Sequence, residues 1–293
     1  MLIVSRFAPS PTGRLHLGHA YSAVRAYDLA REAGGRFLLR IEDIDRTRSR
    51  EEFVHAIEED LRWLGLAWDG PVLRQSERMP IYTQALDRLR ALNLLYPCFC
   101  TRAEIAASAS APHGAEGPIY PGTCRTLPEA ERAARMHEAH CWRLDMTKAV
   151  GVALTAPSVK EAAGLYWHDE FAGWIRADPL SAGDVVLARK EIPTAYHLAV
   201  TIDDAAQGVT DVVRGADLLE ATHIHRLLQA LLGLPTPRYH HHPLLLGPDG
   251  KRLAKRNGAL PLAELRANGA DPAELVAALR KGQLPIGVTT TDA

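Results

Sequence analysis

The sequence predicts an α/β fold built on a parallel, nucleotide-binding sheet, and three observations support this. An apolar run at residues 2–7 predicts a short buried strand, and the turn at 8–13 cannot be helical because it contains two prolines. From His16 onward, apolar residues recur at steps of three and four, which predicts a helix ending at a glycine pair. Residues 36–41 then read as a second strand, completing the first βαβ unit of such a sheet.

The remaining patterns predict how the chain is divided. Helices are expected at residues 51–64, 81–95 and 218–232, and strands at 184–188 and 210–214. Between residues 97 and 179 the pattern breaks into short pieces that carry all four cysteines, which indicates an inserted module. We therefore predict a catalytic domain from residues 1–96 and 180–235, an insertion at 97–179, and a tail at 236–293 with short helices at 262–267 and 272–281.

Composition and charge limit the possible classes of protein. With 293 residues, 47% hydrophobic and 24% charged, the chain is long enough for a large core and has the balance of a globular protein. Its apolar runs are too short to span a bilayer, and Arg6 and Pro9 interrupt any secretory signal. We expect a cytoplasmic monomer without membrane contact. A formal net charge of −1 means that any RNA would be met through local basic patches.

Two histidines stand at the start of the first predicted helix. A helix N-terminus offers free N–H groups and a positive dipole end, where phosphate binds well. His16 and His19 are three residues apart and share the face that would meet such a ligand, while Gly18 allows close approach to the backbone. Taken alone, the string HLGH could equally be a chance pattern on an amphipathic helix.

A basic, glycine-flanked segment at residues 249–256 is the second candidate for contact with phosphate. It contains Lys251, Arg252, Lys255 and Arg256, and by itself it could be a solvated basic turn. A shorter basic run is formed by Arg46, Arg48 and Arg50, with the same alternative.

Residues 6–19, RFAPSPTGRLHLGH, resemble the ATP-binding signature of class I aminoacyl-tRNA synthetases of the glutamyl type. Residues 252–256, RLAKR, resemble the mobile KMSKS loop of the same class, with Lys255 in register. Two positions depart from that loop: Arg252 keeps the charge of a lysine, and Ala254 lacks the hydroxyl of a serine. The resemblance implies that His16, Gly18, His19 and Lys255 bind ATP with Mg²⁺, and that both histidines and Lys255 are catalytic.

A pocket for glutamate needs a fixed cation for the side-chain carboxylate and acceptors for the ammonium group. Arg6 ends the first strand and can offer a two-pronged hydrogen-bonding fork, and Glu42 follows the second strand. Both lie at the sheet edge where open α/β folds bind ligands. The resemblance assigns six residues to glutamate: Arg6, Ala8, Ser10, Glu42, Tyr196 and Arg214. Each one alone could instead be part of a surface ion pair or the core.

The resemblance is most specific to the glutamyl-queuosine tRNA(Asp) synthetase family, a set of shortened paralogues of glutamyl-tRNA synthetase. Val200 and Leu218 replace an asparagine and a tryptophan of the ordinary enzymes, and the chain ends at Ala293, leaving no room for an anticodon-binding domain. The family implies a class I synthetase Rossmann-type sheet with an inserted, acceptor-binding-like zinc module and a short helical tail that resembles a stem-contact region. It also implies tRNA-independent activation of glutamate and transfer to queuosine in tRNA(Asp). The alternatives are a shortened enzyme that charges a 3′ end and a catalytically silent glutamate- or RNA-binding paralogue.

The cysteine spacing predicts a metal site. Cys98, Cys100 and Cys124 lie close together in sequence, and in a cytosolic chain this density favours zinc over disulfides. For the fourth ligand the residues alone favour His113, with Cys141 as another option. The family resemblance implies Tyr120 instead, and four protein ligands would make the zinc structural. Three buried free cysteines are the alternative.

Two further polar groups are expected to be structural. In an extended strand the histidines at 240–242 would alternate between faces, so they are not expected to bind one metal. The pair Asp203 and Asp204 is expected to support the fold rather than hold magnesium.

Overall fold

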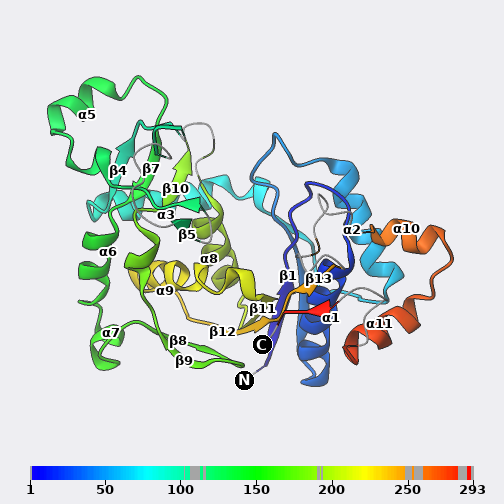
Figure 1. Cartoon of the computed structure of the whole chain (residues 1–293). Helices are drawn as coiled ribbons and strands as arrows, with labels where there is room; N and C mark the ends of the chain where they lie inside the picture. Colours follow the sequence, from blue (N-terminus) through cyan, green and yellow to red (C-terminus); the bar gives the residue numbers. More distant parts are fainter. Residues whose placement is uncertain are drawn as a thin grey trace.

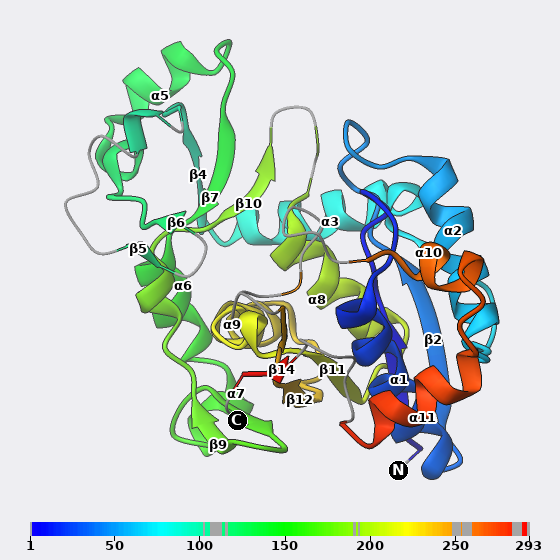
Figure 2. The same cartoon turned by 45° about the vertical axis from the view of Figure 1, so that its right-hand side comes forward.

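The structure is a computed structural model of the chain, and it describes residues 2–101, 103–105, 113–114, 117–189, 192, 194–247, 253, 260–282 and 289–291. In Figures 1 and 2 the helices α1 (Leu17–Glu32), α2 (Glu51–Trp63), α10 (Leu262–Ala267) and α11 (Pro272–Arg280) lie together on one side. The strand β4 (Leu95–Cys98) and the helix α7 (Pro157–Glu161) lie on the other side, with the strands β11 (Asp211–Gly215) and β12 (Arg238–His242) between the two groups.

A parallel sheet forms the centre of the molecule, as the sequence predicts. Its first strand pairs in parallel with the second, which pairs in parallel with the third. On the other side, the Thr210 N–H donates to the Val4 carbonyl over 2.9 Å, which joins the next parallel pair to the sheet. In spatial order the strands are β3 (Leu73–Arg74), β2 (Arg36–Ile41), β1 (Val4–Phe7), β11 (Asp211–Gly215), β12 (Arg238–His242), β8 (Tyr166–Asp169) and the antiparallel β9 (Gly173–Arg176).

The first crossover helix, α1 (Leu17–Glu32), forms where the apolar repeat predicts it. Ala20, Ala23 and Val24 are buried against the sheet, and small side chains let the helix approach the strands closely. The helix ends before Gly34, whose φ of +63° suits a residue without a side chain. The predicted βαβ unit is therefore confirmed.

Other helices connect the strands and pack on them. They are α2 (Glu51–Trp63), α3 (Met79–Ala91), α5 (Glu129–Arg135), α6 (Met146–Ala153), α8 (Tyr196–Ala206), α9 (Ala221–Leu232) and the short turns η1 (Gln75–Glu77), η2 (Thr123–Thr126), η3 (Pro179–Ala182) and η4 (Ala216–Leu218). The helix predicted at 81–95 ends earlier, because Asn93 has a φ of +55° and the chain then enters β4. The helix α8 was not predicted from the sequence, because two of its buried residues, Asp203 and Asp204, are charged and interrupt the apolar pattern.

A second, antiparallel sheet lies apart from the first. It has the order β10 (Val186–Arg189), β7 (Cys141–Leu144), β4, and it carries the cysteines at one end. Short pairs are also formed by β5 (His113–Gly114) with β6 (Gly117–Pro118), and by β13 (Leu245–Leu246) with β14 (Thr289–Thr290). Two strands cross the expected limits of the insertion: β8 pairs with β12 of the central sheet, and β10 pairs with β7.

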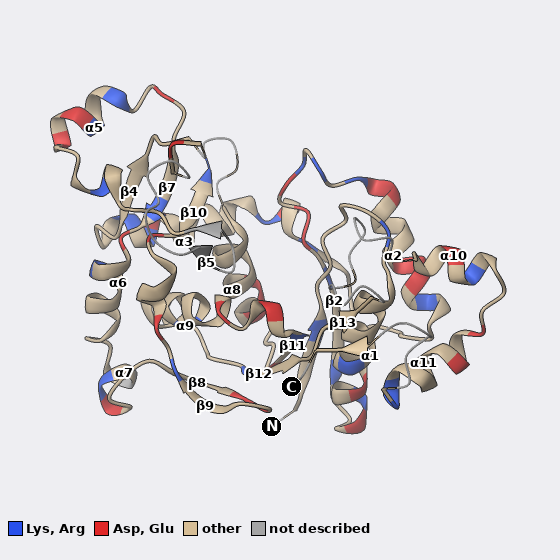
Figure 3. Cartoon of the chain, viewed as in Figure 1, with Lys and Arg blue, Asp and Glu red and all other residues tan. Residues whose placement is uncertain are grey.

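Charges of both signs are interspersed along α2, α5 and α10 (Figure 3), in line with the near-zero net charge. In the part of the chain that the structure describes, no helix combines the length and apolarity that a membrane crossing requires.

Candidate active site

A cleft of about 450 Å³ opens at the carboxyl ends of β1, β2, β11 and β12. From β1 the chain continues to β2 on one side, while β11 and β12 lie on the other side of β1, and open α/β folds bind ligands where the strand order reverses in this way. The cleft brings together nine of the ten residues predicted to bind glutamate or ATP: Arg6, Ala8, Ser10, His16, Gly18, His19, Glu42, Tyr196 and Arg214. The tenth, Lys255, lies outside the described residues, as do Lys251, Arg252, Ala254 and Arg256.

The side chain of Arg6 is held in place by the buried carboxylate of Asp204. Its Nε donates to Asp204 Oδ1 over 2.9 Å, and the same oxygen accepts from Arg40 Nη1 over 2.7 Å. Burial pushes the pKa of Asp204 upward, but the two guanidinium groups outweigh it and hold that pKa below its usual value. Arg6 therefore reaches the cleft with an ion-pair partner already in place.

Glu42 follows β2 and faces the same cleft. Arg40 Nη2 lies 3.4 Å from Glu42 Oε1. Burial raises the pKa of Glu42, and the charges of Arg40 and Arg6 oppose that shift. A carboxylate shielded from water in this way gains from a cationic ligand, so this position suits an ammonium group.

Arg214 has a different environment from Arg6. Its side chain is buried, and its Nε donates to His241 Nε2 over 3.0 Å. The two terminal nitrogens contact the Tyr196 hydroxyl at 3.5 Å, His225 Nδ1 at 3.3 Å, the Leu218 carbonyl at 3.1 Å and Thr222 Oγ1 at 2.6 Å. Among the described residues, no carboxylate forms an ion pair with Arg214. Its charge remains available for an anionic ligand.

The two motif histidines cap α1 in a reciprocal arrangement. The Gly18 N–H donates to His16 Nδ1 over 3.1 Å, and the His16 N–H donates to His19 Nδ1 over 3.2 Å. Their ring centroids are 3.9 Å apart. A side chain at position 18 would come within 3.2 Å of the His16 ring, so glycine keeps this helix end open. The helix start thus combines N–H groups, a positive dipole end and two imidazoles.

A smaller cavity of about 230 Å³ adjoins the cleft and shares Ser10, Glu42 and Tyr196 with it. Arg48 and Arg189 line its other side. Arg48, from the predicted basic run, is exposed, and its Nε donates to Asp45 Oδ2 over 2.7 Å.

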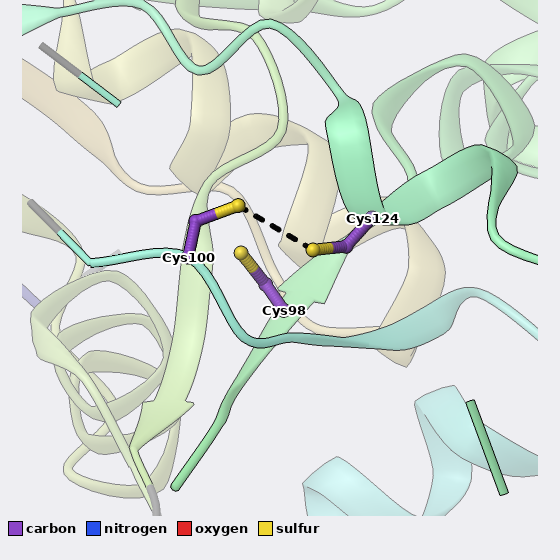
Figure 4. Close-up of side chains that lie close together, drawn as sticks. All are labelled: Cys98, Cys100 and Cys124. Atoms are coloured by element: carbon purple, nitrogen blue, oxygen red, sulfur yellow. Dashed lines mark hydrogen bonds between the residues drawn. The ribbon is translucent and has the colours of Figure 1, made fainter. Parts of the chain in front are cut away.

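Three cysteine side chains converge at the end of the antiparallel sheet (Figure 4). The sulfurs of Cys98, Cys100 and Cys124 all lie within 4.8 Å of one another. The Tyr120 hydroxyl is 3.7 Å from Cys100 Sγ and accepts from the Cys124 N–H over 2.8 Å. A hydrogen bond from Cys141 lowers the pKa of the Cys98 thiol to about 4, although burial opposes this.

These distances fit a metal ion, because thiolates that close together can be bridged by one cation. The cluster could therefore hold a metal. Tyr120 and Cys141 both lie beside it, whereas the side chain of His113 is outside the described residues.

The sequence did not reveal which residues support the cleft. Thr222, His225 and His241 hold Arg214, and they come from α9 and β12. Of these three residues, only His241 stood out in the sequence, as part of the run of histidines at 240–242. The three histidine side chains alternate between the faces of the strand as expected: His240 hydrogen-bonds Asp211, His241 hydrogen-bonds Asp169, and His242 hydrogen-bonds Ser22.

The acidic pair in α8 is structural, as expected. Asp203 accepts from Gln75, Arg78 and Tyr82 over 2.6 to 2.9 Å, and Asp204 accepts from the two arginines described above. Each carboxylate is thus used to join α8 to a neighbouring element.

Comparison with known proteins shows the family. The model of the class I tRNA synthetases (E and Q), catalytic domain, matches residues 2–289. A glutamyl-Q tRNA(Asp) synthetase from Rhodobacter capsulatus is 51% identical over 93% of this chain and 98% of its own length. This chain belongs to the class I glutamyl- and glutaminyl-tRNA synthetases, within the glutamyl-Q tRNA(Asp) synthetase family.

Further comparisons agree with this assignment. A glutamyl-Q tRNA(Asp) synthetase from Symbiobacterium thermophilum is 48% identical over 94% of this chain and 84% of its own length. A crystal structure of a glutamate tRNA ligase from Elizabethkingia meningosepticum in complex with its amino acid has a TM-score of 0.70 and 31% identity. That match covers 88% of this chain but only 53% of the ligase, so the chain spans about half of the ligase's length. The predicted class I α/β fold is confirmed.

Proposed function

We propose that the chain activates L-glutamate with ATP and transfers it to queuosine in the anticodon of tRNA(Asp). The observation that carries this proposal is the 51% identity that extends over 98% of a glutamyl-Q tRNA(Asp) synthetase. The cleft supports it, because paired arginines, a buried glutamate and a helix N-terminus meet in one space.

In the first step, an oxygen of the glutamate α-carboxylate attacks the α-phosphorus of ATP, and the bond to pyrophosphate breaks. Arg6, Arg214 and the Tyr196 hydroxyl bind the carboxylates of glutamate. The Glu42 carboxylate, the backbone of Ala8 and the hydroxyl of Ser10 bind its ammonium group. This set holds the two anions in line for reaction.

ATP, entering with Mg²⁺, lies at the start of α1. Gly18 admits the nucleotide, and His16 and His19 donate to phosphate oxygens as charge shifts toward the leaving pyrophosphate. Lys255 adds a positive charge at the same oxygens. In the second step, a hydroxyl of the queuosine base attacks the glutamyl carbonyl carbon, AMP leaves with the bonding electrons, and the hydroxyl proton is released to water.

Contact with tRNA is local in this proposal. Arg48 lines the cavity beside the glutamate site, and Arg50 lies on the same loop. An unstacked anticodon base can enter a pocket, and the arginines can meet the adjoining phosphates. The proposal includes a cytoplasmic location and a monomeric state.

The cysteine module holds one structural Zn²⁺ in this proposal. Cys98, Cys100 and Cys124 supply three thiolates, and the Tyr120 hydroxyl, 3.7 Å from the sulfur of Cys100, supplies the fourth ligand. Four protein ligands leave no open position on the metal, so its role is to hold β4 and η2 together.

Activation of glutamate does not require tRNA in this proposal. Val200 is buried in α8, and Leu218 lines the cleft while its carbonyl accepts from Arg214. An aliphatic side chain at each position removes the polar or aromatic group through which an RNA could alter the pocket.

ATP–pyrophosphate exchange, measured with glutamate and no RNA, tests this activity. We expect exchange that saturates with glutamate. No exchange in the absence or presence of tRNA would favour a silent glutamate- or RNA-binding paralogue. Exchange only with tRNA, and label on the 3′ ribose, would favour the shortened glutamyl-tRNA synthetase.

A further inference from the structure

A chain of three buried side chains ends on Arg214. His241 is 5% exposed and Asp169 is 1% exposed, and neither lines the cleft. His241 Nε2 accepts from Arg214 Nε over 3.0 Å, and His241 Nδ1 lies 2.7 Å from Asp169 Oδ2. The arginine comes from β11, the histidine from β12 and the aspartate from β8, so three adjacent strands of one sheet set these distances.

The donors and acceptors in this chain allow only one arrangement of protons. A guanidinium has only donors, so the imidazole nitrogen that faces it must carry a lone pair. The proton of a neutral His241 is therefore on Nδ1, where the carboxylate of Asp169 accepts it. Burial and the charge of Arg214 lower the pKa of His241 to about 3, against the effect of Asp169, so the ring stays neutral near pH 7.

Asp169 is itself held as an anion. Its Oδ1 accepts from the N–H groups of Phe171 and Ala172 over 2.9 and 3.0 Å, and its Oδ2 also accepts from the His241 N–H over 3.1 Å. Burial raises its pKa, but the hydrogen bonds from the His241 ring and these N–H groups bring the pKa below its usual value. A carboxylate held by this many donors keeps its place and its charge.

We infer that Asp169 and His241 are positioning residues for glutamate binding. Together they orient Arg214, and the negative charge that balances its guanidinium lies on Asp169, on the far side of the His241 ring. This inference rests on the proposed function, since it assumes that Arg214 binds a carboxylate of the substrate. A carboxylate paired directly with Arg214 would compete with that substrate. With the negative charge displaced, the guanidinium is stabilised in the core, while no carboxylate of the described residues pairs directly with it and its charge can attract an anionic ligand.

The same core offers a matched control. Tyr239 stacks near His241, with ring centroids 5.8 Å apart, and its hydroxyl accepts a hydrogen bond from Gln229 over 3.0 Å. The Tyr239→Phe variant loses one buried hydrogen bond but keeps the ring beside Arg214. It should therefore report the general cost of disturbing this core.

The test is the dissociation constant of glutamate, measured by calorimetry on the full chain. We expect His241→Leu to weaken glutamate binding about 10- to 100-fold, because the Nε of Arg214 loses its acceptor. His241→Gln offers a side-chain oxygen in nearly the same place and should restore most of the affinity. Tyr239→Phe should bind glutamate as the wild type does, and binding of ATP alone should be unchanged in all three variants.

Other outcomes would overturn the inference. If His241→Leu binds glutamate normally, or if Tyr239→Phe loses as much affinity as His241→Leu, the chain has no specific positioning role. If His241→Leu does not fold, the ring nitrogens of His241 in the wild type can be read by NMR, where a proton on Nε2 would contradict the arrangement and a proton on Nδ1 would support it. A wild-type chain that binds no glutamate would refute the proposed function instead.

Discussion

The cleft and the cysteine cluster are assembled in opposite ways. Arg6 and Arg214 come from distant parts of the chain and meet because β1 and β11 are neighbours in the sheet. Cys98, Cys100 and Cys124 are close in sequence and are gathered by one strand end and one short turn. The polar groups of the cleft already have protein partners, whereas the cysteine sulfurs face one another. The cleft is thus organised by the fold, while a bound metal would help to organise the cysteine module.

The largest expected effect is on the chemistry in the cleft. Lys255→Ala should slow adenylate formation about 100- to 1000-fold, because the lysine acts on charge that develops at the phosphates. Single-turnover formation of glutamyl-adenylate measures this rate. The dissociation constant of glutamate should be unchanged, since the fold holds that pocket independently. Weakened glutamate binding with a normal rate would mean that the loop has been misassigned.

The second largest expected effect is on the stability of the cysteine module and should leave the cleft unchanged. If the module holds the proposed zinc, Cys124→Ser should release it and lower the Tm by about 5 to 10 °C, because the module then loses the ion that would join β4 to η2. Glutamate affinity should change little. Metal content by mass spectrometry and a thermal melt check this result, with Cys141→Ser as the control that keeps the metal. If the Cys141→Ser variant loses the metal and a Tyr120→Phe variant retains it, the fourth ligand is Cys141.

The sequence predicted the parts of the molecule that depend on local patterns. The βαβ unit with α1 followed from apolar periodicity and the Gly34 stop, and the cysteine cluster followed from spacing. The residues that support the cleft could not be found in this way. Asp169 contacts His241 across two strands that pair only in the folded sheet, and a lone aspartate at a strand end carries no signal of its distant partner. The end of α3 was misplaced because the positive φ of Asn93 overrides a continuing apolar pattern.

The smallest effect concerns acid stability of the cleft region. Burial lowers the pKa values of His225, His241 and His242 below 6.5, so the unfolded chain binds protons at these sites before the folded chain does. Stability should therefore be highest above pH 6.5 and should fall as the pH drops below it. Urea unfolding at pH 8, 6.5 and 5 measures this change. A midpoint that rises toward pH 5 would contradict neutral, buried histidines.

The identity of the acceptor is the central claim, and defined tRNA(Asp) tests it most directly. The measurement is transfer of radiolabelled glutamate to tRNA(Asp) with and without queuosine, each with and without the 3′-terminal adenosine. We predict that glutamate is transferred only when queuosine is present, and that removal of the 3′ adenosine leaves transfer intact. Transfer that requires the 3′ adenosine and ignores queuosine would contradict this account and identify an enzyme that charges the 3′ end.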